Sequence, residues 1–187
     1  MINPNDLRIT LGDLVAVLNS SQLKFHLTGG LASSFYGEPR FTQDIDVVIR
    51  VAIGQTLNQL VQALAQKFIV DADAIADAVL RKGIFQALHE ESMIKVDFHV
   101  GEAIRGELDR SHSEEILAGV VVPLVSKEDA ILSKLLWIAK GSGKSRQDVR
   151  MMLKRSGEID FTYLNSQAAD LGVANILNDI RDVEEIA

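Results

Sequence analysis

The sequence predicts an α/β fold that continues into a purely helical region. Up to about residue 125, short runs rich in β-branched residues alternate with runs whose apolar residues recur at helical spacing. Glycine and proline separate many of these runs, as expected of turns. From Ser126 on, only helical patterns remain. We therefore expect an α/β domain at residues 1–125 and a C-terminal helical region at residues 126–187.

Helical spacing predicts four helices in the first part. Their expected ranges are Asn5–Asn19, Leu31–Gly37, Gln55–Lys67 and Asp71–Gly83. Asp6 and Asp71 are the expected N-caps of the first and last of these, because short polar side chains accept hydrogen bonds from free amides at a helix start. Gly37 and Gly83 are the expected ends.

Strand patterns fill the space between these helices. The expected strands are Leu23–Thr28, Asp44–Val51, Ile84–Glu90, Met93–Val100 and two short ones around Gly119. The third and fourth are separated only by Glu91 and Ser92, which predicts a hairpin. In the tail, Ser126 is the expected N-cap of a helix through Ala139. A helix at 144–155 and two more, split at Gly172, complete the prediction.

Composition restricts the class of protein. The chain has 187 residues, 47% of them hydrophobic and 24% charged, which is typical of a globular domain with at most a small appendage. A net charge of −7 argues against wrapping of DNA or binding to anionic membranes. The absence of cysteine excludes disulfides and thiolate chemistry. The N-terminus lacks signal-peptide order, and no apolar run spans a membrane, so we expect a cytoplasmic protein.

Two carboxylates stand in an apolar strand. Because side chains alternate across a strand, Asp44 and Asp46 share one face, opposite Ile45 and Val47. Such a pair is unfavourable unless a cation offsets the two charges. Few hard oxygen ligands suit magnesium, which takes further ligands from substrate phosphates.

A second strand repeats this arrangement. The alternation of "MIKVDFHV" places Lys95, Asp97 and His99 together on the polar face. Asp97 would be the third carboxylate of a two-metal site. The other interpretation, that Asp97 is simply exposed, stays open at this point. His99 could hydrogen-bond Asp97, although an ordinary strand histidine is the preferred interpretation.

A glycine pair precedes the carboxylates. Gly29 and Gly30 follow a strand and open a helix, where free amides and the helix dipole favour anions. Alone, the pair indicates only a tight turn. With Asp44 and Asp46 shortly beyond it, the pair predicts phosphates at one end of a site and metals at the other.

These motifs resemble the nucleotidyltransferase superfamily with the DNA polymerase beta-like palm. The matching elements are Thr28-Gly29-Gly30, Asp44-Ile45-Asp46 and Asp97, although Thr28 is less hydrophobic than the usual residue. More narrowly, "GGLASSFYGEPRFTQDIDVVI" and Lys95-Val96-Asp97 are similar to small bacterial nucleotidyltransferases of the abortive-infection type. The resemblance implies an α+β palm with a small mixed sheet flanked by helices.

The resemblance also implies an activity. A hydroxyl acceptor on a protein, a tRNA or a small molecule would attack a nucleoside triphosphate and release pyrophosphate. Mg²⁺ or Mn²⁺ would be the cofactor, and an antitoxin would be a possible partner. Asp44, Asp46 and Asp97 would be the catalytic and metal-binding residues. The expected phosphate-binding residues are Gly29, Gly30, Ser33, Arg40, Lys95 and Lys134.

Several alternatives stay open. The chain could be a catalytically idle member of the fold that acts as a binding partner or antitoxin; a magnesium nuclease is disfavoured. Arg40 could clamp phosphate or pair with an aspartate, and Lys95 could be a solvated lysine. Lys134 and Asp148 loosely match a helical lysine and a later aspartate of the abortive-infection type. Arg146, Arg150 and Lys154 recur along one helical face. This face is either solvated or a surface that contacts phosphates. Trp137 is predicted to pack in the core or between helices.

Overall fold

A computed structural model describes residues 3–40, 42–51, 55–155 and 157–185. These residues form a seven-stranded mixed sheet and nine helices, which confirms the predicted α/β class. None of the described helices combines the length and apolar composition needed to cross a membrane.

The elements follow one another in an order that places most helices between strands. The strands are β1 (Lys24–Thr28), β2 (Asp44–Arg50), β3 (Phe68–Ile69), β4 (Ile84–His89), β5 (Lys95–Val100), β6 (His112–Leu117) and β7 (Val120–Leu124). The helices are α1 (Pro4–Ser20), α2 (Gly29–Tyr36), α3 (Gln55–Leu64), α4 (Ala72–Arg81), α5 (Glu107–Arg110), α6 (Lys127–Ala139), α7 (Lys144–Lys154), α8 (Phe161–Asp170) and α9 (Ala174–Glu185).

The sheet has the strand order β3-β4-β5-β2-β1-β7-β6. Strand β2 pairs antiparallel with β1 and parallel with β5, and β1 pairs parallel with β7. The predicted hairpin is confirmed, since β4 and β5 pair antiparallel. The centre of the sheet is therefore formed by the two strands that carry the aspartates.

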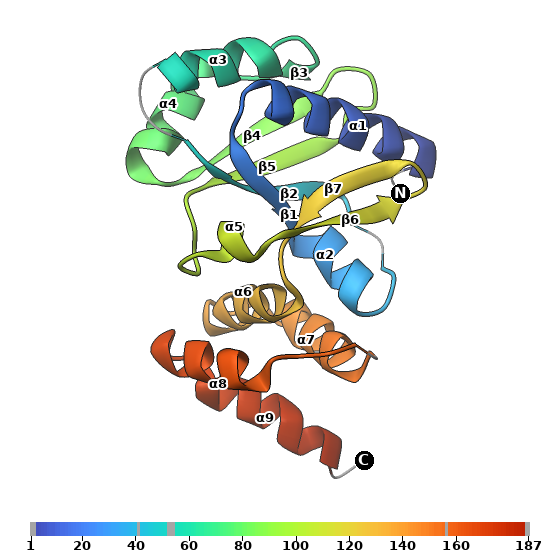
Figure 1. The fold of residues 1–187 in the computed structure, drawn as a ribbon, viewed down its shortest axis with the longest axis vertical. Coiled ribbons are helices and arrows are strands. Elements are labelled where there is room, and N and C mark those ends of the chain that lie inside the picture. Colours follow the sequence, from blue (N-terminus) through green and yellow to red (C-terminus); the bar gives the residue numbers. More distant parts are fainter. Residues whose placement is uncertain (1–2, 41, 52–54, 156, 186–187) are drawn as a thin grey trace.

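Helices cover both faces of the sheet. Helices α1, α3 and α4 lie on one side, whereas α2 and the tail helices α6 and α7 lie on the other (Figure 1). The apolar face of β2 is fully buried at Ile45, Val47 and Ile49. These side chains belong to one core with the buried leucines of α1, so burial of this face offsets the cost of bringing carboxylates into the sheet.

The predicted domain boundary near residue 125 coincides with the last strand. The sheet ends at Leu124, and only helices follow it. Helix α6 nevertheless packs on α2, and the division into an α/β domain at residues 1–125 and a helical region at residues 126–187 stays a prediction.

Three details differ from the prediction. Asn3, not Asp6, caps α1, because the Asn3 side chain accepts a hydrogen bond from the amide of Asn5. Strand β3 and helix α5 were not predicted; they have two and four residues, too few to show periodicity. The caps at Asp71 and Ser126 are confirmed by hydrogen bonds to amides two or three residues later.

Candidate active site

The polar face of the sheet carries the predicted carboxylates in register. Parallel pairing of β2 with β5 places Asp46 directly beside Asp97. Strand β4 extends the same register to a third strand. Three rows of side chains therefore cross this face: Asp44–Lys95–Leu88, Asp46–Asp97–Gln86 and Val48–His99–Ile84.

The three carboxylates contact polar side chains of β4 and β5, and Asp44 and Asp97 share Lys95. Lys95 Nζ lies 2.7 Å from Asp97 Oδ2 and 3.6 Å from Asp44 Oδ2. Gln86 donates a hydrogen bond of 2.9 Å to the other oxygen of Asp97. His99 Nε2 lies 3.2 Å from Asp46 Oδ1, so this histidine contacts Asp46, whereas the sequence favoured an ordinary strand histidine and offered Asp97 as the alternative partner.

The glycine turn packs directly on Asp46. Thr28 is paired with Asp46 across β1 and β2, so the next residue, Gly29, meets the carboxylate. Gly29 has φ +63°, and a Cβ there would lie 1.8 Å from Asp46 Oδ2. The amide of Gly30 donates to the same oxygen at 3.4 Å. The glycine pair and the aspartate therefore belong to one site.

The surroundings of Asp46 lower the pKa of its carboxyl group. Burial alone would raise the pKa of Asp46, but other contributions outweigh it and lower the pKa below its ordinary value. These are the hydrogen bond and charge of His99, the amide of Gly30 and the charge of Lys134. The carboxylate is thus kept negative, the state needed to bind cations or accept protons.

A cleft of about 520 Å³ opens beside Asp46, between the sheet and the helical tail. Its basic side chains are Arg40, Lys82, Lys134, Lys140 and Lys144, and its acidic ones are Asp46, Glu102, Glu107 and Asp148. The cleft is therefore locally more positive than a chain with a net charge of −7. Such a surface attracts anionic ligands.

Asp148 joins the loop after α2 to the tail. Arg40 binds both oxygens of Asp148, with Nε–Oδ1 at 2.8 Å and Nη2–Oδ2 at 3.0 Å. Lys134 Nζ lies 3.0 Å from the same Oδ2. The loosely matched pair Lys134 and Asp148 is thus brought together with Arg40, facing the glycine turn.

Of the predicted phosphate ligands, Gly29, Arg40 and Lys134 line the cleft, whereas Gly30, Ser33 and Lys95 do not. Ser33 is 3% exposed, and its hydroxyl donates to the carbonyl of Gly29 at 2.8 Å. This contact tightens the first turn of α2 and does not present the hydroxyl to the cleft. A role of Ser33 in phosphate binding stays a prediction.

A family model matches residues 13–174 of the chain, and its description is "Nucleotidyl transferase AbiEii toxin, Type IV TA system". The chain belongs to the AbiEii nucleotidyltransferase family. The match contains β1, α2, β2 and β5, and it extends through α8 of the tail. No curated protein matches the sequence.

Solved structures share the fold of this AbiEii protein at low identity. An antigenic nucleotidyltransferase-like protein from Paracoccidioides brasiliensis is 21% identical with a TM-score of 0.55, covering 89% of this chain and 87% of its own. The antibiotic-resistance factor ANT(2'')-Ia is 18% identical with a TM-score of 0.57, covering 96% of both chains. These likenesses establish a nucleotidyltransferase-like fold.

The carboxylates of the AbiEii protein fit a hard divalent cation in chemistry and in strand position. The side chains do not converge, however, and the described residues contain no group of three or more acids or histidines arranged to hold a metal. Lys95 instead places its ammonium within 3.6 Å of both Asp44 and Asp97. A cation would have to replace this lysine contact.

The Arg40–Asp148–Lys134 cluster provides a first testable prediction. Asp148→Asn removes the charge that balances two cations, and Asp148 is only 7% exposed. We expect a loss of about 1.5–3 kcal/mol in the free energy of unfolding, the cost of breaking hydrogen bonds to charged groups. Urea unfolding measures it. The exposed Asp170→Asn in α8 is the matched control, and an equal stability of both variants would contradict the cluster's role.

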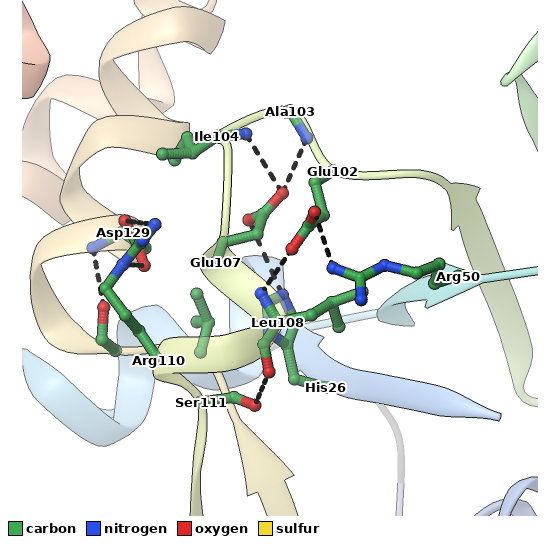
Figure 2. A network of polar contacts seen from close by, with 12 residues as sticks. His26, Arg50, Glu102, Ala103, Ile104, Glu107, Leu108, Arg110, Ser111 and Asp129 are labelled. Carbon is green, nitrogen blue, oxygen red and sulfur yellow. Dashed lines mark hydrogen bonds and ion pairs between the residues drawn. The ribbon is translucent and has the colours of Figure 1, made fainter. Parts of the chain in front are cut away.

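A network of polar contacts includes three residues that line the cleft, Glu102, Ala103 and Glu107 (Figure 2). Glu107 Oε1 accepts hydrogen bonds from the amides of Ala103 at 2.7 Å and Ile104 at 3.2 Å, which closes the loop before α5. Arg110 binds both oxygens of Asp129, at 2.8 and 3.1 Å, and so joins α5 to α6. The network fixes the tail against the sheet.

His26 lies under this network and is fully buried. Its Nε2 is 3.7 Å from Glu107 Oε2, and neither ring nitrogen has a hydrogen-bond partner. Burial lowers the pKa of His26 to about 4, although Asp129 and Glu102 oppose this shift. The folded protein therefore holds a neutral histidine at neutral pH.

This histidine predicts a pH dependence of stability. The unfolded chain binds a proton at His26 below pH 6.5, whereas the folded chain does so only below about 4. The stability due to His26 is therefore present above pH 6.5 and is lost as the pH falls to 4, by about 3 kcal/mol. Urea unfolding of the wild type and of His26→Phe should show a difference that changes over this range and is constant above it. Parallel curves would contradict the assignment.

Two residues of the site were missed or misassigned. The core packing predicted for Trp137 is wrong, because its side chain is 45% exposed and lines the cleft. Helical spacing alone cannot distinguish a core face from the wall of a cleft. Glu107 was not singled out, since nothing in its local sequence indicates that it is 2% exposed.

Proposed function

We propose that this protein transfers a nucleoside monophosphate from a nucleoside triphosphate to a hydroxyl acceptor and releases pyrophosphate. The observation that carries the proposal is the contact of Gly29 with Asp46, which lies in register with Asp97 at the edge of a basic cleft. The family supports nucleotidyl transfer in general. The acceptor class (protein, tRNA or small molecule) and the metal dependence belong to the proposal.

The chain's own groups have separate tasks in this reaction. The amides of Gly29 and Gly30 at the start of α2 and the cations Arg40 and Lys134 hold the triphosphate. Lys95, beside Asp97, neutralises charge on the transferred phosphate. Asp97 accepts the proton of the attacking hydroxyl. Ionised Asp46 places a negative charge directly beside the glycine turn.

The cofactor of this proposal is Mg²⁺ or Mn²⁺. Asp44, Asp46 and Asp97 are the residues that would hold it. When bound, it would stabilise charge on the phosphates and lower the pKa of the attacking hydroxyl.

The protein would act as the toxin of a toxin–antitoxin pair, as the family description states for the family. An antitoxin would then be its partner. Co-expression with the product of the neighbouring reading frame tests this role: rescue of growth supports it, and growth arrest that persists, or never occurs, contradicts it.

Labelled triphosphates test the activity. Each of ATP, CTP, GTP and UTP with ³²P at the α position is incubated with Mg²⁺ or Mn²⁺ and with tRNA, protein or aminoglycoside acceptors. Label transfer to one acceptor class is expected. Failure of every triphosphate to bind in the presence of metal, measured by calorimetry, would overturn the proposal.

A catalytically idle role is the second candidate. It is favoured by the position of Lys95, whose ammonium lies where a cation between Asp44 and Asp97 would be. An idle protein would bind no divalent metal at this site. Titration with Mn²⁺, followed by electron paramagnetic resonance, separates the candidates, because an active protein with ATP should bind the ion.

A further inference from the structure

A tryptophan side chain lines the cleft. Trp137, the only tryptophan of the chain, lies near the end of α6 and is 45% exposed. Lys134 lies one helical turn earlier and also lines the cleft, where it contacts Asp148. Residues three apart share a helix face, so the indole lies one turn beyond the cations assigned to the triphosphate.

The sheet contributes one exposed apolar side chain, Ile84, to the same cleft, whereas Val48 is only 6% exposed. The row Val48–His99–Ile84 lies next to the row of Asp46 and Asp97, and all three of its residues line the cleft. Ile84 is 53% exposed. Large exposed apolar side chains that line one cleft indicate a ligand with an apolar face.

We propose that Trp137 stacks on the base of the nucleoside triphosphate in the cleft that Ile84 also lines. This inference rests on the proposed function and adds the base-binding part of the same site. A nucleotide carries anionic phosphates and a flat aromatic base. The cleft offers cations for the phosphates and an indole for the base. Stacking needs only the π-face that every base has, so this contact adds affinity for all four nucleotides.

Lys140 is compatible with this role. Its Nζ lies 5.3 Å from the centroid of the indole ring, and its side chain is exposed. A cation–π contact at an exposed position is weaker than base stacking, so a base can displace the flexible lysine. The displaced ammonium remains in the cleft, near the phosphates.

The test compares ATP with inorganic tripolyphosphate, which has the phosphates but no base. Calorimetry on the full chain should show that Trp137→Ala weakens ATP binding about 5- to 100-fold. Tripolyphosphate binding should change less than twofold. Trp137→Phe should restore most of the affinity for ATP, because it keeps an aromatic face. A purely structural role would weaken both ligands alike and would overturn the proposal.

The single tryptophan gives an independent readout in the wild-type protein. ATP, CTP, GTP and UTP should quench its fluorescence, and tripolyphosphate should not. If calorimetry shows bound ATP but the fluorescence is unchanged, the base-stacking role is overturned and the proposed function stands. If neither ATP nor tripolyphosphate binds, the proposed function fails as well.

Discussion

Replacing Asp46 with asparagine is expected to lower nucleotide transfer by about 100- to 1,000-fold, the range found when a key charge-stabilising group is removed. Asparagine has nearly the same shape, so the contacts with Gly29 and Gly30 can persist while the negative charge is lost. The effect is therefore electrostatic, and the melting temperature should change by only a few degrees. Transfer of α-³²P at saturating triphosphate and metal measures the effect.

The matched control for Asp46→Asn is Asp170→Asn, an exposed aspartate in α8. This control should keep full activity. Activity of Asp46→Asn within tenfold of the wild type, with an unchanged fold, would contradict the assigned role of Asp46.

Replacing Gly29 with alanine is expected to lower nucleotide transfer about as strongly as replacing Asp46 with asparagine. A Cβ at this position would lie 1.8 Å from Asp46 Oδ2 and 2.4 Å from its Cγ, so the carboxylate must move. A displacement of about 1 Å in a catalytic group can cost about 100-fold in rate. The left-handed backbone at φ +63° adds about 1–2 kcal/mol of destabilisation. Label transfer and urea unfolding measure the two effects.

Gly12 in α1 offers a matched control, because the substitution is also glycine to alanine. A Cβ on Gly12 would meet no atom within 4 Å. Gly12→Ala should therefore raise the free energy of unfolding by about 0.5–1 kcal/mol, the usual gain in a helix interior, and leave activity unchanged. If Gly29→Ala behaved like Gly12→Ala, the close contact of Gly29 with Asp46 would be contradicted.

The aspartate face could be predicted from the sequence because alternation along a strand is a local rule. Asp44 and Asp46 had to share a face once Ile45 and Val47 were buried. The hairpin placed Asp97 on its own polar face in the same way. Local patterns could not predict which strand pairs with β5 on its other side. Parallel pairing of β2 with β5 depends on the whole topology and was not predicted; the family resemblance implied only that Asp97 belongs to the same site as Asp44 and Asp46.

The partners of the charged side chains could not be predicted. Asp148 meets Arg40 across 108 residues of sequence, and no spacing rule covers such a distance. Lys95 could be assigned to the polar face, but its contact with Asp97 depends on side-chain conformation. Trp137 was misassigned for a related reason: helical spacing identifies a face of α6 without indicating whether protein or a cleft lies opposite it.

In the proposed reaction, the cleft beside Asp46 directs attack to the α-phosphorus of a nucleoside triphosphate. The most direct measurement compares the same triphosphate labelled with ³²P at the α or at the γ position, with the acceptor class that accepts label. We expect the α label on the acceptor and the γ label in pyrophosphate. Transfer of the γ label to the acceptor, or release of γ-labelled orthophosphate with no α transfer, would contradict it.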